Sequence, residues 1–266
     1  YRFLLPDNYD PAQEYPLILS LHGGAGRGND NESQMRHWTE NFTKAAWRAK
    51  YPCVVIAPQS DDYWSITGDA LPEFTDAELA KLPEAWQSRL REGTLPTEPV
   101  KDGSLTKAFA LIDKICEDYN IDKERVYVLG HSGGAFGTWN TLWAAPERFA
   151  AAIPSAGGMM PWKDPAKFKD VPSWTFHGAA DKVVSVDNTR AIYARMQEVG
   201  GNLKYSELPG KGHGVSWTSF ALEGNKNARG YSTQCASEQC DKTPLVWEWL
   251  FAQSLAAPEQ IHPPGK

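Results

Sequence analysis

The pentapeptide GHSGG at residues 130–134 lies between a short apolar run, VYVL at residues 126–129, and a segment from 134 to 144 that favours a helix. This order places the serine on a sharp strand-to-helix turn, where its hydroxyl projects above a sheet. Small residues on both sides allow the backbone to make that turn. A phosphate-binding loop is the alternative, but no lysine follows the glycines as that motif requires. The pentapeptide therefore predicts Ser132 as a nucleophile.

Strand-like apolar runs alternate with helical segments on both sides of this turn. Strands are expected at residues 2–5, 17–21, 53–57, 126–129, 151–154, 174–176 and 203–208, and helices at residues 34–50, 75–90, 105–119, 134–144, 187–198 and 243–255. Such alternation is typical of crossover units around a parallel sheet. Together with the serine turn, it predicts an α/β-hydrolase fold with a mostly parallel central sheet flanked by helices.

A serine nucleophile needs a positioned base, and in this fold an acid and then a histidine follow it along the chain. His213 is the favoured base because it follows the last predicted strand with a glycine on each side. His177 ends a strand, and His262 lies in the C-terminal tail. Asp181 is the favoured acid, since it follows the penultimate strand and can orient the imidazole. Asp187 is the alternative, although we expect it to begin the next helix.

Attack on a carbonyl creates a negative charge on its oxygen, which backbone amides stabilise in an oxyanion hole. The amide of Gly133 is the first expected donor, because it directly follows the nucleophile. The second is expected from the glycine-rich loop HGGAG at residues 22–26, which follows an apolar strand. The Gly24 amide is favoured there, with Ala25 as the alternative.

The composition is that of a globular protein, with 266 residues of which 41% are hydrophobic. The net charge is −6 and no basic cluster stands out, which argues against nucleic acid or an anionic membrane surface as a partner. No apolar run reaches the ~20 residues that a membrane helix needs. The expected partner is an ester substrate, and serine chemistry of this kind requires no cofactor and no metal.

The chain is expected to form one catalytic domain over residues 1–257 and an extended tail over residues 258–266. Residues 59–103 are rich in proline and do not fit the strand–helix alternation. Long connections of this kind are usually functional or disordered. We interpret this one as a lid-like insertion near the active site.

Four cysteines are present, and two of them lie close together in the polar stretch CASEQC. Cys235 and Cys240 are expected to form a short-range disulfide, which favours an oxidising compartment. Cys53 and Cys116 lie on apolar segments and are expected to be buried and inert. The predicted location is secreted or periplasmic.

The chain resembles an esterase group of the α/β hydrolases that includes feruloyl and acetylxylan esterases and polyhydroxybutyrate depolymerase-like proteins, some described as predicted peptidases or phospholipase/carboxylesterase-like. The resemblance runs from about residue 1 to residue 251. The matching stretches are YRFLLPDNYDPAQEYPLILSLHGGAGRGNDN, VIAPQ, YNIDKERVYVLGHSGG, WTFHGAADKVV and PGKGHGVSW. The resemblance implies the same triad, and it suggests that Gln59, Trp64 and Trp217 face the cleft as substrate-binding residues.

The chain departs from this group at two places beside the site. Many relatives carry a methionine after the nucleophile, whereas Gly133 follows Ser132 directly here, and residues 219–242 form a longer segment than usual. We therefore predict a serine carboxylic ester hydrolase that forms an acyl-enzyme, with acyl esters of plant polysaccharides, feruloyl or acetyl, as the leading substrates. A serine peptidase, a polyester depolymerase and a non-catalytic binding module are the alternatives.

Overall fold

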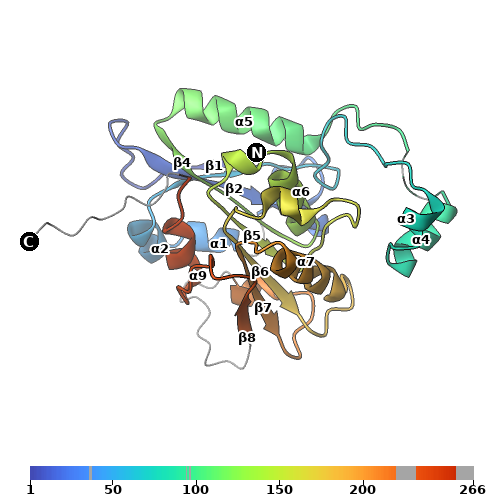
Figure 1. Cartoon of the computed structure of the whole chain (residues 1–266). Helices are drawn as coiled ribbons and strands as arrows, with labels where there is room; N and C mark the ends of the chain where they lie inside the picture. Colours follow the sequence, from blue (N-terminus) through green and yellow to red (C-terminus); the bar gives the residue numbers. More distant parts are fainter. Residues whose placement is uncertain (36–37, 94, 96, 220–231, 256–266) are drawn as a thin grey trace, which may run out of the picture.

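The structure, a computed structural model, describes residues 1–35, 38–93, 95, 97–219 and 232–255. The strands in this part of the chain form one eight-stranded sheet in the order β1-β3-β2-β4-β5-β6-β7-β8 (Figure 1). They are β1 (Arg2–Leu4), β2 (Tyr15–Leu21), β3 (Val54–Ala57), β4 (Ile121–His131), β5 (Ala151–Ser155), β6 (Ser173–Gly178), β7 (Leu203–Leu208) and β8 (Ser232–Cys235). The predicted tail, the residue His262 and the middle of the segment 219–242 lie outside the described residues.

The six central strands run parallel, and only the two edge strands, β1 and β8, are antiparallel to their neighbours. In register, His131 at the end of β4 pairs with Ser155 at the end of β5. The end of β6, Gly178, pairs with Leu208 at the end of β7. The carboxyl ends of these strands therefore meet at one edge of the sheet, where loops can bring side chains together.

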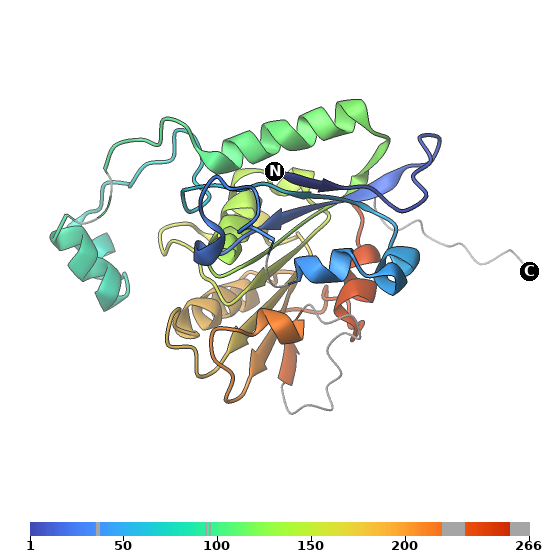
Figure 2. The ribbon, with the colours of Figure 1, turned by 180° about the vertical axis from the view of Figure 1, so that it is seen from behind.

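Helices cover both faces of the sheet, as Figures 1 and 2 show. They are α1 (Thr39–Phe42), α2 (Ala45–Lys50), α3 (Asp76–Leu79), α4 (Glu84–Arg91), α5 (Ser104–Asp118), α6 (Gly133–Ala144), α7 (Asp187–Glu198), α8 (Ser216–Ser219) and α9 (Val246–Phe251), with the short 3-10 helices η1 (Gly24–Gly26), η2 (Pro146–Arg148) and η3 (Pro165–Phe168). Apolar side chains of α5, α6 and α7 pack in one core, and those of α1, α2 and α9 pack in a second. The predicted fold class is confirmed by this architecture.

The sequence misplaced several helix boundaries. The helix expected over residues 34–50 is divided into α1 and α2, and the one expected over residues 75–90 is divided into α3 and α4. Pro83 precedes α4, where its ring and missing amide hydrogen prevent a continuous helix. The strand β8 was not predicted, because its sequence STQC is polar and lies at a sheet edge, with two of its four residues exposed and two half-buried.

The insertion has two parts: one is hydrogen-bonded to the body of the protein, and the other stands away from it. Residues 60–68 are tied to α5, where the Leu105 amide donates to the carbonyl of Ser65 over 2.9 Å. Residues 74–91, which we call the arm, carry α3 and α4 and stand out from the sheet (Figure 2). The arm meets the body at Trp162, whose ring centroid is 5.4 Å from that of Trp86. In the described ranges, no helix combines the length and apolarity that crossing a membrane demands.

Candidate active site

Ser132 lies between the end of β4 and the start of α6, in a backbone conformation that is rare for residues with a side chain. Its φ is 55° and its ψ is −119°. Such a conformation is strained and persists only where the surrounding structure enforces it. Here the Ser132 amide donates to the Ser155 carbonyl over 2.9 Å, and the amides of Ala135 and Phe136 donate to the Ser132 carbonyl.

Two glycines of the pentapeptide are required by close packing. A Cβ atom on Gly130 would lie 2.2 Å from the carbonyl oxygen of Gly134. A Cβ atom on Gly134 would lie 2.1 Å from the carbonyl oxygen of Leu21, at the end of β2. Both contacts are far inside van der Waals distance. The pattern Gly-x-Ser-x-Gly is thus needed for the strand-to-helix turn to fit against the neighbouring strand.

His213 and Asp181 complete a chain of hydrogen bonds from Ser132. His213 Nε2 lies 2.9 Å from Ser132 Oγ, and His213 Nδ1 lies 2.7 Å from Asp181 Oδ2. Because a carboxylate only accepts hydrogen bonds, Nδ1 carries the hydrogen, which leaves Nε2 to accept from the serine hydroxyl. The loop that carries His213 packs tightly on β6, since a Cβ on Gly178 would lie 2.3 Å from the Lys211 carbonyl.

The Asp181 side chain is fully buried but remains ionised. Burial opposes its ionisation, but hydrogen bonds from His213 and from two backbone amides outweigh that effect and lower the pKa of Asp181 below its usual value. The two amides are those of Val183 and Val184, which donate to Oδ1 over 2.8 and 3.0 Å. Oδ2 is therefore the oxygen that faces the imidazole. The alternative acid, Asp187, begins α7 and pairs with Arg190 instead.

His177 supports the acid rather than replacing His213 as the base. Its Nε2 lies 3.0 Å from the Val184 carbonyl and 3.2 Å from Asp181 Oδ2, and its Nδ1 lies 2.7 Å from Thr189 Oγ1. Burial lowers the pKa of His177, which favours the neutral ring. A neutral ring with its hydrogen on Nε2 donates to the Val184 carbonyl, and its Nδ1 then accepts the single hydrogen of the Thr189 hydroxyl in preference to the more distant Gly157 carbonyl at 3.2 Å.

The two predicted oxyanion donors lie next to each other. Gly133 is the first residue of α6 and Gly24 is the first residue of η1, and amides at these positions have no partner within their helices. A Cβ on Gly133 would lie 3.4 Å from the Gly24 nitrogen. This proximity favours Gly24 over the alternative Ala25 as the second donor.

The loop that carries Gly24 is held by His22 and Gln59. His22 Nδ1 donates to the Gly23 carbonyl over 2.9 Å, and the Ser60 amide donates to His22 Nε2 over 3.0 Å. Burial lowers the pKa of His22, which keeps the ring neutral. Gln59 Nε2 donates to the Gly26 carbonyl over 3.1 Å, and Gln59 Oε1 accepts from a backbone amide. The Gln59 amide group is engaged with this loop, and Gln59 also lines a cavity of about 430 Å³, so a role for Gln59 in substrate binding stays a prediction.

The two predicted substrate-binding tryptophans differ in exposure. Trp64 is only 1% exposed, and its indole Nε1 donates to the His22 carbonyl over 2.9 Å. Trp64 thus supports the loop and also lines the same cavity as Gln59, so a role for Trp64 in substrate binding stays a prediction as well. Trp217 is 58% exposed and lies four residues after His213, at the start of α8. A role for Trp217 in substrate binding stays a prediction.

Tyr63 lies beside the candidate site, although the sequence did not single it out. Its side chain is 62% exposed, and its Cδ1 would lie 3.5 Å from a Cβ on Gly133. The guanidinium of Arg27 lies 4.4 Å from the centroid of the Tyr63 ring. No motif or periodicity in the sequence marks Tyr63 or Arg27 as part of the site. For Tyr63 the sequence signal is its aromatic side chain within the insertion.

The predicted disulfide is absent, because Cys235 and Cys240 are both free thiols. Burial and the neighbouring Cys240 raise the pKa of Cys235 to about 11, which disfavours the thiolate needed for oxidation. Cys53 is buried as expected, and Cys116 is half-buried.

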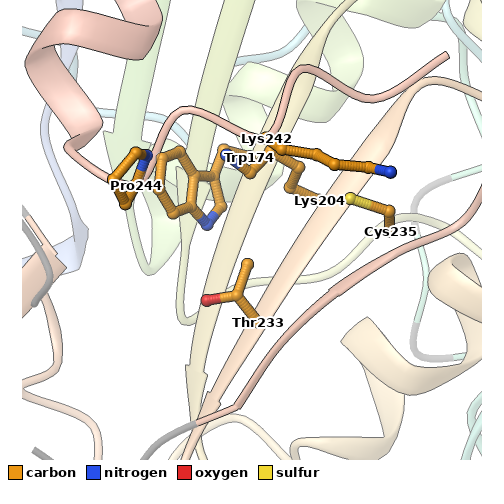
Figure 3. A pocket seen from close by; sticks show the side chains of 6 residues that line it. All are labelled: Trp174, Lys204, Thr233, Cys235, Lys242 and Pro244. Atoms are coloured by element: carbon orange, nitrogen blue, oxygen red, sulfur yellow. The ribbon is translucent and has the colours of Figure 1, made fainter. Parts of the chain in front are cut away.

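A cavity of about 270 Å³ lies beside Cys235, and Figure 3 shows the side chains around it. It is lined by Trp174, Lys204, Thr233, Cys235, Lys242 and Pro244. Lys204 is 2% exposed, and its Nζ lies 3.6 Å from the centroid of the Trp174 ring and donates to a backbone carbonyl. None of the Ser132, His213 and Asp181 side chains lines this cavity, so it is separate from the candidate active site.

Comparisons with known proteins match this fold to solved structures of esterases. No family model matches the chain. A solved structure described as a thermostable esterase matches with a TM-score of 0.69 at 29% identity, covering 95% of this chain and 58% of that one. A feruloyl esterase module from Clostridium thermocellum, complexed with sinapinate, matches with a TM-score of 0.52 at 14% identity, covering 82% of this chain and 79% of that one. The chain thus has the α/β-hydrolase fold, and both of these solved structures are described as esterases.

A curated relative is an uncharacterized secreted protein of Arthroderma benhamiae. It is 30% identical over 235 residues, which cover 77% of this chain and 22% of the relative. The chain therefore spans about a fifth of the length of the curated relative that it matches, and less than two thirds of the thermostable esterase.

Proposed function

We propose that this chain is a serine carboxylic ester hydrolase that acts through an acyl-enzyme. The observation that carries the proposal is the unbroken hydrogen-bond chain from Ser132 through His213 to Asp181, with the serine on a strained turn. In this mechanism, Ser132 Oγ attacks the ester carbonyl carbon as His213 Nε2 takes its proton. The tetrahedral intermediate then collapses, and the leaving alcohol takes that proton from His213.

The acyl-enzyme is hydrolysed by the same groups in reverse roles. His213 Nε2 takes a proton from water as the water oxygen attacks the acyl carbonyl, and it returns the proton to Ser132 Oγ when the acid is released. In both halves the Gly133 and Gly24 amides donate to the oxyanion. Asp181 holds the imidazole in the required tautomer and stabilises its protonated form.

The proposal extends to substrate and location. The sequence resemblance supports acyl esters carried by plant polysaccharides, with a feruloyl or an acetyl group. A secreted location is supported by the curated relative, which is called secreted. A serine peptidase would use the same groups, but no contact in the described structure favours an amide over an ester.

The test is turnover of methyl acetate by the wild type and by Ser132→Ala. We expect kcat of the variant to be lower by about 1,000-fold or more, because the variant lacks the hydroxyl that attacks the ester. A fluorophosphonate should label the wild type at Ser132 and leave the variant unlabelled, and circular dichroism should confirm that both are folded. Undiminished turnover by the folded variant would overturn the proposal.

A further inference from the structure

The guanidinium of Arg27 is fixed beside the candidate active site by contacts to neutral groups. Its Nε donates to the Asp61 carbonyl over 2.7 Å, and its Nη2 donates to the same oxygen. The charge lies over the Tyr63 ring, 4.4 Å from the centroid. Among the described residues, no acidic side chain forms an ion pair with Arg27. A backbone carbonyl has no net charge, so the positive charge of Arg27 is not neutralised.

The same aromatic ring connects this guanidinium to the oxyanion donors. Tyr63 Cδ1 would lie 3.5 Å from a Cβ on Gly133, while the other contact of the ring is with Arg27. Arg27 also follows Gly24 by three residues on the oxyanion loop. An ester whose carbonyl oxygen accepts from the Gly133 and Gly24 amides can therefore extend a second group to Arg27.

The outer edge of the guanidinium keeps the geometry that binds a carboxylate. An arginine side chain has five N–H donors, and the Asp61 carbonyl takes one from Nε and one from Nη2. Two donors on Nη1 and one on Nη2 remain, and within the described part of the chain none of them has an acceptor. Adjacent donors on Nη1 and Nη2 form the fork that binds both oxygens of a carboxylate.

The acidic side chains near Arg27 are engaged with other groups. Asp62 accepts from the hydroxyl groups of neighbouring serines, and Asp30 accepts from two backbone amides of its own loop, over 2.9 Å each. A hydrogen bond with Asp102 and the charge of Asp61 raise the pKa of Lys107, so the Asp61 carboxylate acts on that lysine. The fork of Arg27 is therefore left for a ligand.

Two further cations lie on the loops that carry the acid and the base. Lys182 directly follows Asp181, and Lys211 precedes His213 by two residues. Both are exposed, and in the part of the chain that the structure describes neither forms an ion pair. The two loops are joined, because the Ala180 amide donates to the Lys211 carbonyl over 2.9 Å.

Each of the three loops that build the site thus carries one unpaired cation within the described structure, although the net charge of the chain is −6. The three residues are far apart in the sequence, so no basic run marks them. Charges of one sign around a binding site attract ligands of the opposite sign.

We propose that the candidate active site binds esters that carry a second, ionised carboxyl group, and that Arg27 binds this carboxylate. The inference rests on the proposed ester hydrolysis and narrows its substrate class by charge. Arg27 supplies a fork in a fixed position, while Lys182 and Lys211 raise the local concentration of anionic ligands. A neutral ester gains neither contribution.

The test compares esters that match in shape and differ in charge. On the acyl side these are the half methyl esters of succinic, glutaric and adipic acids, each with its neutral monoamide. On the alcohol side they are the acetyl esters of the corresponding hydroxy acids, again each with its amide. The three spacer lengths allow for the distance between the reacting carbonyl and Arg27.

The variants separate the charge of Arg27 from its fork. Arg27→Gln removes the charge, and Arg27→Lys keeps the charge without the fork. Arg91→Gln is the matched control, because Arg91 is an exposed arginine on the arm whose Nη2 donates to the neutral side chain of Gln87 over 3.0 Å.

We expect the wild type at low salt to prefer the carboxylate ester over its amide about tenfold in kcat/KM, on at least one side of the ester and at one spacer length. Arg27→Gln should remove most of this preference, mainly through KM, whereas Arg27→Lys should keep part of it. Arg91→Gln should not alter it. Because Arg27 also holds the Asp61 carbonyl, loss of that contact alone would slow both esters and leave their ratio unchanged.

Salt and the two lysines test the contribution of the surrounding charges. The preference should weaken as the salt concentration rises, because exposed charges are screened. The double variant Lys182→Gln/Lys211→Gln should lower the preference by a smaller factor than Arg27→Gln and make it less sensitive to salt. A preference that is independent of salt would contradict the proposed role of the lysines.

Ester hydrolysis can stand while the carboxylate site fails. That result is turnover of methyl acetate that depends on Ser132, together with no carboxylate preference at any spacer length or with a preference that Arg27→Gln leaves unchanged. NMR titration of the folded Ser132→Ala protein with the same ester pairs measures binding without catalysis. Tighter binding of the carboxylate that Arg27→Gln weakens supports the site even if no ester is turned over, and equal affinity for carboxylate and amide refutes it.

Discussion

The substitution Asp181→Asn tests the candidate site directly, because the neighbouring hydrogen-bond donors fix the orientation of the new amide group. Two backbone amides, those of Val183 and Val184, donate to Asp181 Oδ1. The Asn oxygen must therefore occupy that position to keep accepting them. Its NH₂ group is then directed at His213 Nδ1, where Oδ2 lies in the wild type at 2.7 Å.

This orientation inverts the tautomer of the base. An NH₂ group donates, so Nδ1 of His213 must accept and the ring hydrogen moves to Nε2. Nε2 then donates to Ser132 Oγ and can no longer take its proton. The corresponding change in a serine protease lowers kcat by about 10,000-fold with the geometry intact. We expect a loss of the same order here, equivalent to about 5 kcal/mol in activation free energy.

The assay is kcat/KM for methyl acetate between pH 6 and pH 10, with urea unfolding to verify that the variant is folded. Asp181→Ala is the companion variant, because it removes the acceptor without forcing the wrong tautomer. Asn should therefore be at least as damaging as Ala, although it is closer in shape to Asp. A folded Asn variant that retains activity within tenfold of the wild type would refute the tautomer argument.

Three further predictions concern stability, each measured by urea unfolding. Burial lowers the pKa of His177, so below pH 6.5 the unfolded chain binds a proton that the folded chain does not. The free energy of unfolding should therefore fall as the pH drops below 6.5, and an unchanged pH dependence in His177→Gln would contradict this. Gly134→Ala should lower the free energy of unfolding by about 3 kcal/mol or more, because its Cβ would lie 2.1 Å from the carbonyl oxygen of Leu21. Gly24→Ala should lower it little, because no atom lies within 4 Å of a Cβ at that position. Equal losses in the two variants would refute the packing argument. Burial lowers the pKa of Lys204 from 10.5 to about 8, so the free energy of unfolding should rise between pH 8 and pH 10.5. The rise should be at most about 3 kcal/mol, because contact with the Trp174 ring favours the ammonium form and opposes the shift. If the same rise persists in Lys204→Met, another group causes it.

The parts of the site that sequence could predict are those with a local pattern. Ser132 stands in a pentapeptide in which Gly130 and Gly134 are required, because a Cβ atom on either would lie about 2 Å from a backbone oxygen. The motif therefore follows from the packing of this turn. His213 and Asp181 were located by their order after successive strands, which the parallel topology makes reliable. From β4 to β8 the strands lie side by side in chain order, so the order of these residues along the chain also gives their order along one edge of the sheet.

Residues within the insertion could not be assigned in this way. Gln59 and Trp64 were expected to face the cleft, yet both are engaged with the loop that carries Gly24. Tyr63, between them in the same stretch, is the exposed aromatic residue beside Gly133. Neighbouring side chains in an irregular segment point in directions that only tertiary contacts decide. Aromatic content therefore identified the segment but not the residue.

The contacts of this segment also limit how the site can vary. The Ser60 amide holds the His22 ring, and the Trp64 indole holds the His22 carbonyl, so residues 60–68 help to set the position of the oxyanion loop. Asp62 ties the same segment together by accepting from Ser60 Oγ and from the Trp64 amide, each over 2.8 Å. The arm at residues 74–91 lies beyond these contacts and reaches the body at Trp162. Changes in the arm can therefore leave the oxyanion loop in its place, whereas changes in residues 60–68 affect groups that hold this loop.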